Sequence, residues 1–268
     1  MHIPKVRHLM THLTLHYPSR ILGTNTTIHI LIPSITGLEQ IPGQSPFPKL
    51  SGTFLLLHGM QNDPEEILLN TSIARYADAC RLAVILPEGG NSFWVDPVPD
   101  AGYETFLTLE LLPALRALLP LSEERESTFI GGYSIGGYGS LRLALRHPEL
   151  FSRCVVLSGA LDVRFSAAFV KSATPALMPH LLMHPRTLPG SEYDLKTVFD
   201  SFPNGCEKPE LYFACGEDDY FCRTSREYAE YAASRGFSAP CYITEGDHDW
   251  DYWDNALKCA MEWLISRA

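Results

Sequence analysis

Short runs of apolar residues recur along the 268-residue chain and predict buried strands. Continuous apolar runs of this length are typical of parallel strands that helices cover on both faces. Strands are predicted at 52–57, 82–86, 128–130, 151–159, 211–215 and 240–244. Two further β-rich runs, 13–17 and 26–32, are separated by Pro18, Gly23 and Asn25, and they predict an antiparallel hairpin at the edge of the sheet.

Segments with apolar residues at helical spacing lie between these runs. Helices are predicted at 63–78, 103–119, 224–235 and 252–266, with another directly after the run at 128–130. Strands that alternate with helices predict an α/β fold with a mostly parallel sheet and helices on both faces. We expect one domain over 1–268. The pattern loosens in the proline-rich stretch 161–205, which predicts a cap or lid insertion.

A G-x-S-x-G motif, Gly132 to Gly136, lies between a predicted strand and a predicted helix. In a nucleophile elbow of this kind the turn is so tight that glycine is required on both sides, and Ser134 is exposed at the helix N-terminus. The Ile135 N–H is an unpaired donor of the first helical turn, where the helix dipole favours negative charge. The motif therefore predicts a serine nucleophile beside an oxyanion site. Alone, it is equally typical of a glycine-rich turn that only packs a helix on a sheet.

The strand at 52–57 ends in His58, Gly59 and Met60. A small residue at such a strand end lets the next N–H, that of Met60, point into a cleft as the second oxyanion donor. For His58 we favour a packed histidine without a chemical role.

A base and an acid are needed to activate a serine hydroxyl. The chain offers Ser134, then Asp219 or Asp218, then His248, which is the chain order of α/β-hydrolases. His248 is the only histidine after the acid loop. Asp219 is the first choice of acid and Asp218 is the second. Asp247 and Asp249 are expected to be solvent-exposed charges in a loop.

The loop 88–99 follows a predicted strand, a position that carries function in open α/β sheets. Trp94 and Phe93 could wall a substrate cleft or fill the core beneath a lid. Trp94 and Tyr133 are the candidate substrate-binding residues.

Composition narrows the classes of partner. The net charge is −10 and no basic run of five occurs, which argues against nucleic acid and anionic membrane surfaces. The N-terminus lacks the apolar core of a signal peptide, so we expect a cytoplasmic protein. Seven cysteines without C-x-x-C spacing predict reduced thiols and no zinc site. We expect no metal or cofactor, and an acidic surface that is compatible with a homo-oligomer.

Several motifs together resemble the esterase D family, and within it the bacterial tributyrin esterase-like carboxylesterases. The matching segments cover about 200 residues in order: HGM at 58–60, LPEGGNSFWVD at 86–96, YETFLTLELLP at 103–113, GGYSIGGYGSLRLALRHPELF at 131–151, CGEDDYF at 215–221 and EGDHDWDYWDNAL at 245–257. The resemblance implies Ser134 as nucleophile, His248 as base, Asp219 as acid, and the N–H groups of Met60 and Ile135 as oxyanion donors.

The resemblance also implies an activity, which is hydrolysis of short acyl esters, in some members those of acetylated or feruloylated sugars. S-formylglutathione hydrolases are related. The chain departs from the family in Gln61 to Pro64, where small polar residues or glycine are usual, and in Ile135, where methionine is more common. We expect a short-chain carboxylesterase. The alternatives are an acyltransferase on the same scaffold, a thioesterase similar to the S-formylglutathione hydrolases, and a non-catalytic binding protein.

Overall fold

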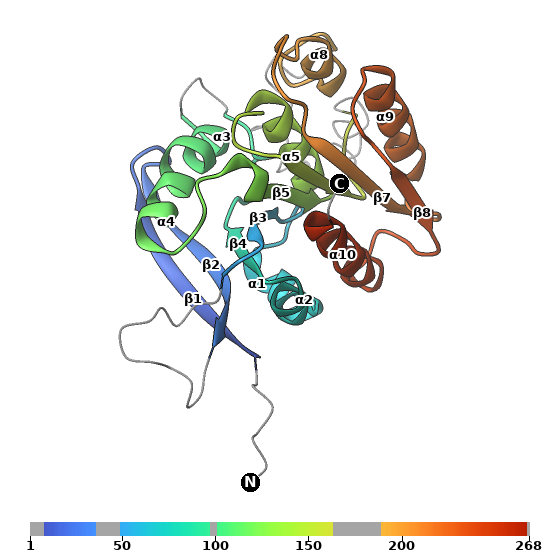
Figure 1. Ribbon diagram of the computed structural model, residues 1–268. Helices are drawn as coiled ribbons and strands as arrows, with labels where there is room; N and C mark the ends of the chain where they lie inside the picture. Colours follow the sequence, from blue (N-terminus) through green and yellow to red (C-terminus); the bar gives the residue numbers. More distant parts are fainter. Residues whose placement is uncertain (1–7, 36–48, 97–100, 163–188, 267–268) are drawn as a thin grey trace.

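One eight-stranded sheet forms the centre of the computed structural model, which describes residues 8–35, 49–96, 101–162 and 189–266 (Figure 1). The strand order is β1-β2-β4-β3-β5-β6-β7-β8. All pairs from β4 to β8 are parallel, as predicted. The strands are β1 His8–Ser19, β2 Thr24–Ile35, β3 Gly52–Leu57, β4 Leu82–Pro87, β5 Thr128–Tyr133, β6 Arg153–Leu157, β7 Glu210–Gly216 and β8 Cys241–Thr244.

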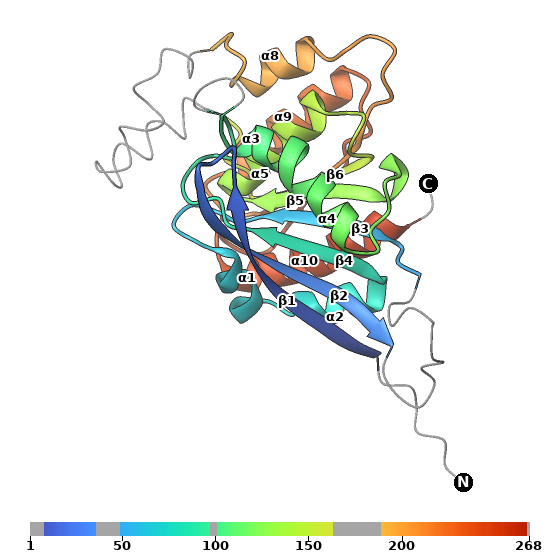
Figure 2. The same ribbon diagram turned by 90° about the vertical axis from the view of Figure 1, so that its left-hand side faces the viewer.

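The predicted N-terminal hairpin is present and is longer than its apolar runs. Strands β1 and β2 pair antiparallel along their whole length, from His8 opposite Ile35 to Ser19 opposite Thr24. Strand β2 also pairs antiparallel with β4, so β1 is the edge strand (Figure 2). The hairpin therefore extends a parallel sheet by two antiparallel strands.

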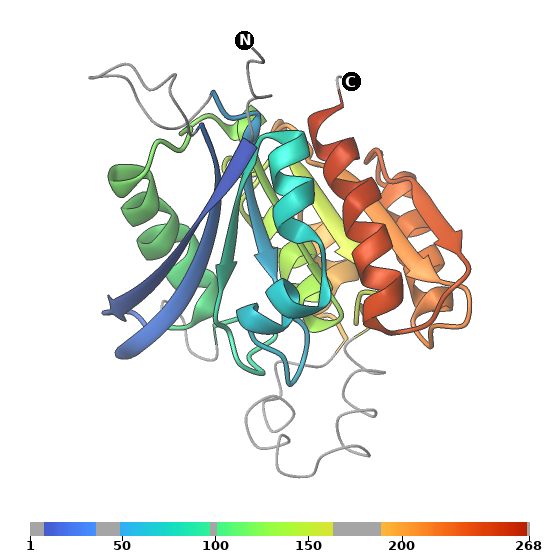
Figure 3. The same ribbon diagram turned by 90° about the horizontal axis from the view of Figure 1, so that it is seen from below.

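Helices cover both faces of the sheet. Helices α2 and α10 lie side by side on one face (Figure 3), and α4, α5 and α9 lie on the other. Each layer buries its own cluster of apolar side chains against the sheet. The helices are α1 Pro64–Asn70, α2 Ile73–Cys80, α3 Tyr103–Thr105, the π-helical η1 Phe106–Leu111, α4 Leu112–Leu118, the 3₁₀ turn η2 Arg125–Ser127, α5 Ile135–Arg146, α8 Leu195–Asp200, α9 Cys222–Ser234 and α10 Trp250–Ile265.

The single helix predicted over 63–78 is wrong, because the chain breaks into α1 and α2. Thr71 is extended, with φ −129°, and its hydroxyl donates to the Ile67 carbonyl. The Ser72 N–H, which would otherwise continue one helix, donates at 2.6 Å to the carboxylate of Asp254 in α10. A partner 182 residues away in the chain therefore ends α1, and no local pattern could reveal it.

The predicted cap insertion at 161–205 lies mostly outside the described residues, because 163–188 are not among them. The described remainder includes α8, which contacts the nucleophile helix α5. Among the described residues, no helix has both the length and the apolar character needed to cross a membrane.

Candidate active site

Ser134 stands in a strained turn between β5 and α5. Its φ of +56° and ψ of −121° are costly for a residue with a side chain, and such strain is typical of functional sites. Backbone bonds hold it there, since its N–H donates to the Leu157 carbonyl at 3.0 Å and its own carbonyl accepts from Ala160 at 3.0 Å. A β-carbon at Gly132 or Gly136 would overlap neighbouring backbone, which explains both glycines of the motif.

The loops after β7 and β8 bring an acid and an imidazole to Ser134. His248 Nε2 lies 3.2 Å from Ser134 Oγ, and His248 Nδ1 lies 2.8 Å from Asp219 Oδ2. The two loops touch at Gly216, where a β-carbon would overlap the Gly246 carbonyl. Because an ionised carboxylate can only accept, Nδ1 carries the proton and Nε2 is free to accept from the serine hydroxyl. The structure thus brings all three predicted residues into one hydrogen-bonded chain.

Asp219 is buried and remains ionised. Its side chain is 0% exposed. Burial alone would raise the pKa of this carboxyl, but the hydrogen bond and charge of His248, with a 2.7 Å bond from the Phe221 N–H, hold the pKa below its usual range. Ser158, whose hydroxyl accepts from the Trp253 indole at 3.2 Å, also hydrogen-bonds Asp219. The imidazole is therefore oriented by a carboxylate that is itself fixed on several sides.

The alternative acids have other contacts. Asp218 is exposed and joins the site only through its backbone N–H, which donates to the Gly246 carbonyl at 3.1 Å. Asp247 accepts from the His248 N–H, and Asp249 caps α10 by accepting from the Tyr252 N–H at 2.9 Å. These two carboxylates shape the loop around the imidazole, and Asp219 alone contacts its ring.

His58 is a packed histidine, as the sequence favours, and it also holds the peptide that precedes Met60. The ring is fully buried, with Nδ1 2.8 Å from the Gly59 carbonyl oxygen and Nε2 accepting from the Gly89 N–H at 3.0 Å. Nδ1 is therefore the donor. Because the Gly59 carbonyl and the Met60 N–H share one planar trans peptide and point to opposite sides, the bond to His58 turns the Met60 N–H away from His58.

The backbone of the loop after β3 also lies close to Ser134. A β-carbon on Gly59 would meet the Tyr133 ring at 2.7 Å and the Ser134 Cβ at 3.3 Å. Met60 and Ile135 both line the pocket at Ser134. The two residues predicted to donate to an oxyanion thus lie on two neighbouring loops beside Ser134.

Trp94 and Tyr133, the predicted substrate-binding residues, lie outside the lining of this pocket. Trp94 is 1% exposed, and its indole N–H donates to the His58 carbonyl at 3.2 Å. Tyr133 is 0% exposed, its ring centroid lies 4.6 Å from that of Trp253, and its hydroxyl donates to the Asn62 side chain at 3.1 Å. The predicted substrate contact is therefore replaced by a packing role, since both aromatic rings complete the core behind the site.

A pocket of about 190 Å³ opens at Ser134 between these loops. One wall is polar and is formed by Gln61 and Asn62, the residues that depart from the family pattern. The Gln61 N–H donates to the Asn91 side chain at 2.7 Å, so the first loop is tied to the loop after β4. The other lining residues are Met60, Phe93, Ser134, Ile135, Ala160, Tyr220, Phe221, His248 and Trp253. In the described ranges, no group of three or more His, Cys, Asp or Glu side chains is placed to hold a metal ion.

The sheet, the elbow and the chain order of the three residues define an α/β-hydrolase fold. The chain belongs to the Esterase family, described as "Putative esterase", which matches residues 40–264. An acetyl esterase of Caldicellulosiruptor saccharolyticus is 30% identical over 264 residues, which are 95% of this chain and 98% of that protein.

Two solved structures are similar over nearly the whole chain. The S-formylglutathione hydrolase FrmB of Staphylococcus aureus aligns with a TM-score of 0.81 and 27% identity, covering 96% of this chain and 100% of that one. The fluorophosphonate-binding serine hydrolase FphF of the same organism aligns with a TM-score of 0.84 and 26% identity, covering 96% and 99%.

Proposed function

We propose that this protein is a serine carboxylesterase that hydrolyses short acyl esters, from acetyl to butyryl, through an acyl-enzyme on Ser134. The observation that carries the proposal is the chain of hydrogen bonds from Asp219 through His248 to Ser134, which ends in a small pocket. The acetyl esterase relative, which aligns over almost its full length, supports the same class of substrate.

In the proposed reaction, Ser134 Oγ attacks the ester carbonyl carbon while His248 Nε2 takes its proton. The tetrahedral oxyanion accepts hydrogen bonds from the N–H groups of Met60 and Ile135. The C–O bond of the ester then breaks, and the imidazolium gives its proton to the departing alcohol. Water enters, His248 takes one of its protons, and the hydroxide attacks the acyl-enzyme. The carboxylic acid leaves as Ser134 regains its proton, so no cofactor is consumed.

The size of the pocket supports a short acyl group. Pockets for drug-sized ligands measure about 300–1,000 Å³, whereas the described residues leave about 190 Å³ at Ser134. The walls of the pocket include three aromatic side chains that limit the length of the acyl group, Phe93, Tyr220 and Phe221. Gln61 and Asn62 offer polar groups to an alcohol portion with hydroxyl groups.

A panel of p-nitrophenyl esters from acetate to laurate, together with methyl ferulate and acetylated xylan, tests the proposal. We expect activity to peak at four carbons or fewer, and Ser134→Ala to be folded and to lose about 10⁴-fold or more of the rate. A preference for laurate, or a Ser134→Ala enzyme with wild-type rate, would contradict the proposal.

A thioesterase that acts on S-formylglutathione is the second candidate, because the likeness to FrmB covers the whole of that chain. The same serine chemistry cleaves a thioester with a thiolate as the leaving group. Measuring kcat/KM for S-formylglutathione and for p-nitrophenyl acetate on one preparation separates the two candidates. A large excess for the thioester would replace the carboxylester proposal, and product transferred to an added polyol in excess of hydrolysis would indicate an acyltransferase.

A further inference from the structure

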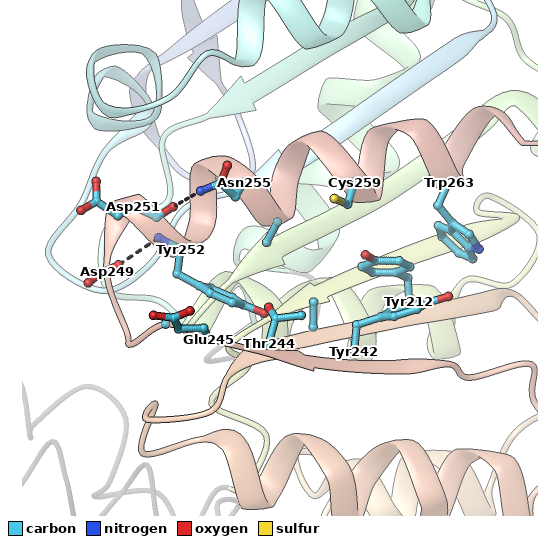
Figure 4. Close-up of a pocket in the computed structure, with 13 residues that line it drawn as sticks. Tyr212, Tyr242, Thr244, Glu245, Asp249, Asp251, Tyr252, Asn255, Cys259 and Trp263 are labelled. Carbon is cyan, nitrogen blue, oxygen red and sulfur yellow. Dashed lines mark hydrogen bonds between the residues drawn. The ribbon is translucent and has the colours of Figure 1, made fainter.

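A second and larger cavity lies on the other side of the His248 loop, between α10 and the edge strand β8 (Figure 4). Its volume is about 640 Å³, which is within the range of small-molecule sites. The first turn of α10 separates it from the pocket at Ser134, because Tyr252 lines the cavity while the next residue, Trp253, lines the pocket. We call this cavity the α10 groove.

The α10 groove has an aromatic floor with hydroxyl groups. Tyr212 and Tyr242 are stacked at 4.8 Å with 29° between their planes, and Trp263 lies 5.2 Å from the Tyr212 ring. Tyr242 is 46% exposed on the edge strand β8. Asp251 and Trp263 lie twelve positions apart, which is about 18 Å along the helix, and Figure 4 shows these two residues at opposite ends of the groove.

The hydroxyl of Tyr212 limits the kind of ligand that the groove can hold. Tyr212 is 5% exposed and lines the groove, and its hydroxyl is not among the buried polar atoms that lack a partner in the described residues, so it opens to the groove. A ligand that covers this hydroxyl has to offer it a hydrogen-bond partner, since leaving it unpaired would cost free energy. Thr244 and the exposed Asn255 add further neutral donors and acceptors to the same cavity.

The charged side chains of the groove argue against an anionic ligand and do not require a cationic one. Its lining holds three carboxylates and no lysine, arginine or histidine. Two of these carboxylates are explained by α10 itself, because Asp249 caps the helix and Asp251 lies in its first turn, where the helix dipole favours negative charge. Glu245 is left as an exposed acceptor. A purely apolar ligand would leave the Tyr212 hydroxyl unpaired.

We propose that the α10 groove binds a neutral saccharide. The C–H faces of sugar rings lie on exposed aromatic surface such as Tyr242, and sugar hydroxyls both donate and accept. They would therefore satisfy Tyr212, Asn255 and Glu245 together. A saccharide held here would lie one helical turn from the pocket at Ser134. In catalysis, the groove would hold a carbohydrate chain while its acyl groups are hydrolysed at Ser134. This role rests on the proposed function, whereas saccharide binding itself does not.

Binding is tested without catalysis, on Ser134→Ala protein titrated with xylotriose or cellotriose in a calorimeter. We expect millimolar binding of at least one of them, weakened about fivefold or more by Tyr242→Ala. Asn255→Ala is a second test at an exposed position, and Glu262→Ala, exposed on α10 outside the groove, is the matched control. Absence of binding by both sugars, or binding that neither groove variant weakens, would overturn the proposal.

Two other occupants have their own outcomes. Tetramethylammonium that binds more tightly than the sugars, with the same dependence on Tyr242, would replace the saccharide by an organic cation. A concentration-dependent dimer that Tyr242→Ala dissociates would replace it by a second copy of the chain. With active enzyme, Tyr242→Ala should lower the rate on acetylated xylan relative to the rate on p-nitrophenyl acetate. No hydrolysis of either ester would contradict the esterase proposal and leave the binding result standing.

Discussion

Asp219 and Glu104 are both buried carboxylates with lowered pKa values, but they lie in opposite kinds of surroundings. Asp219 contacts one imidazole, whose second nitrogen faces Ser134 in an open pocket. Glu104, in α3, is surrounded by three basic groups of the nucleophile helix and its end: its carboxylate accepts from Arg142, from Arg146 at 2.7 Å and from His147 at 3.0 Å.

Asp219 therefore has surroundings that suit a role in catalysis, whereas the surroundings of Glu104 suit a role in stabilising the fold. The partner of Asp219 can gain a proton from a neighbouring hydroxyl, and the carboxylate stabilises the imidazolium that results. The partners of Glu104 include two guanidinium groups that stay charged at any working pH, so nothing there changes during a reaction. Burial raises the pKa of the Glu104 carboxyl, but the His147 hydrogen bond and the two arginines outweigh it and lower the pKa strongly.

Replacing Asp219 gives the largest expected effect on rate. Asp219→Asn keeps the shape of the side chain but removes the charge that orients the imidazole, so we expect kcat for p-nitrophenyl acetate to fall about 10⁴-fold. Asp218→Asn, exposed and adjacent, is the control and should remain near the wild-type rate. Steady-state kinetics on both variants measure this, and equal losses in the two would remove Asp219 from the proposed mechanism.

Replacing Glu104 should affect stability instead of chemistry. Glu104→Gln leaves Arg142, 2% exposed, without its charge partner, and breaking a buried pair of this kind costs about 3–5 kcal/mol in the free energy of unfolding. Glu192→Gln, whose half-exposed carboxylate is 3.8 Å from Arg142, is the control, with an expected cost of about 0–1 kcal/mol. Denaturant unfolding gives both values. A Glu104→Gln protein as stable as Glu192→Gln would show that the cluster is not a stabilising element.

His58 is expected to have a smaller effect on the rate, through the peptide that it holds. His58→Gln loses the ring contacts to Gly59 and Gly89, so the Met60 N–H is less well fixed and kcat should fall by up to about 10²-fold with little change in KM. Trp94→Phe, which removes only the indole bond to the His58 carbonyl, should lower kcat less. If His58→Gln raises KM and leaves kcat unchanged, His58 does not position the oxyanion site.

The sequence predicts the sheet well, because strands are marked by local patterns, and it offers Ser134, Asp219 and His248 as candidates through their chain order. Apolar runs mark the strands, and the glycines around Ser134 follow from close backbone contacts at the elbow. The uses of side chains far apart in the sequence could not be predicted. The sequence leaves Trp94 open between a cleft and a core position, and the fold places it on His58. Nothing in the sequence marks Glu104, which α5 brings against Arg142. In each case the missing information is a contact between distant segments.

The smallest effect we expect is on the acid dependence of stability. Both carboxyls have pKa values below their usual range in the folded protein, so the unfolded chain binds more protons as the pH falls. The stabilisation is fully present above the ordinary carboxyl pKa of about 4 and is lost as the pH falls through it towards the lower folded values.

The urea midpoint of the wild type should therefore decrease from about pH 5 to pH 3. Glu104→Gln should reduce this decrease in the midpoint, and Asp219→Asn should reduce it by a smaller amount. The reason is that Glu104 has three basic partners, whereas Asp219 has one imidazole. Equal slopes in the wild type and Glu104→Gln would mean that Glu104 is not the group whose protonation weakens the fold. The loss of stability at low pH would then have to come from carboxylates elsewhere in the chain.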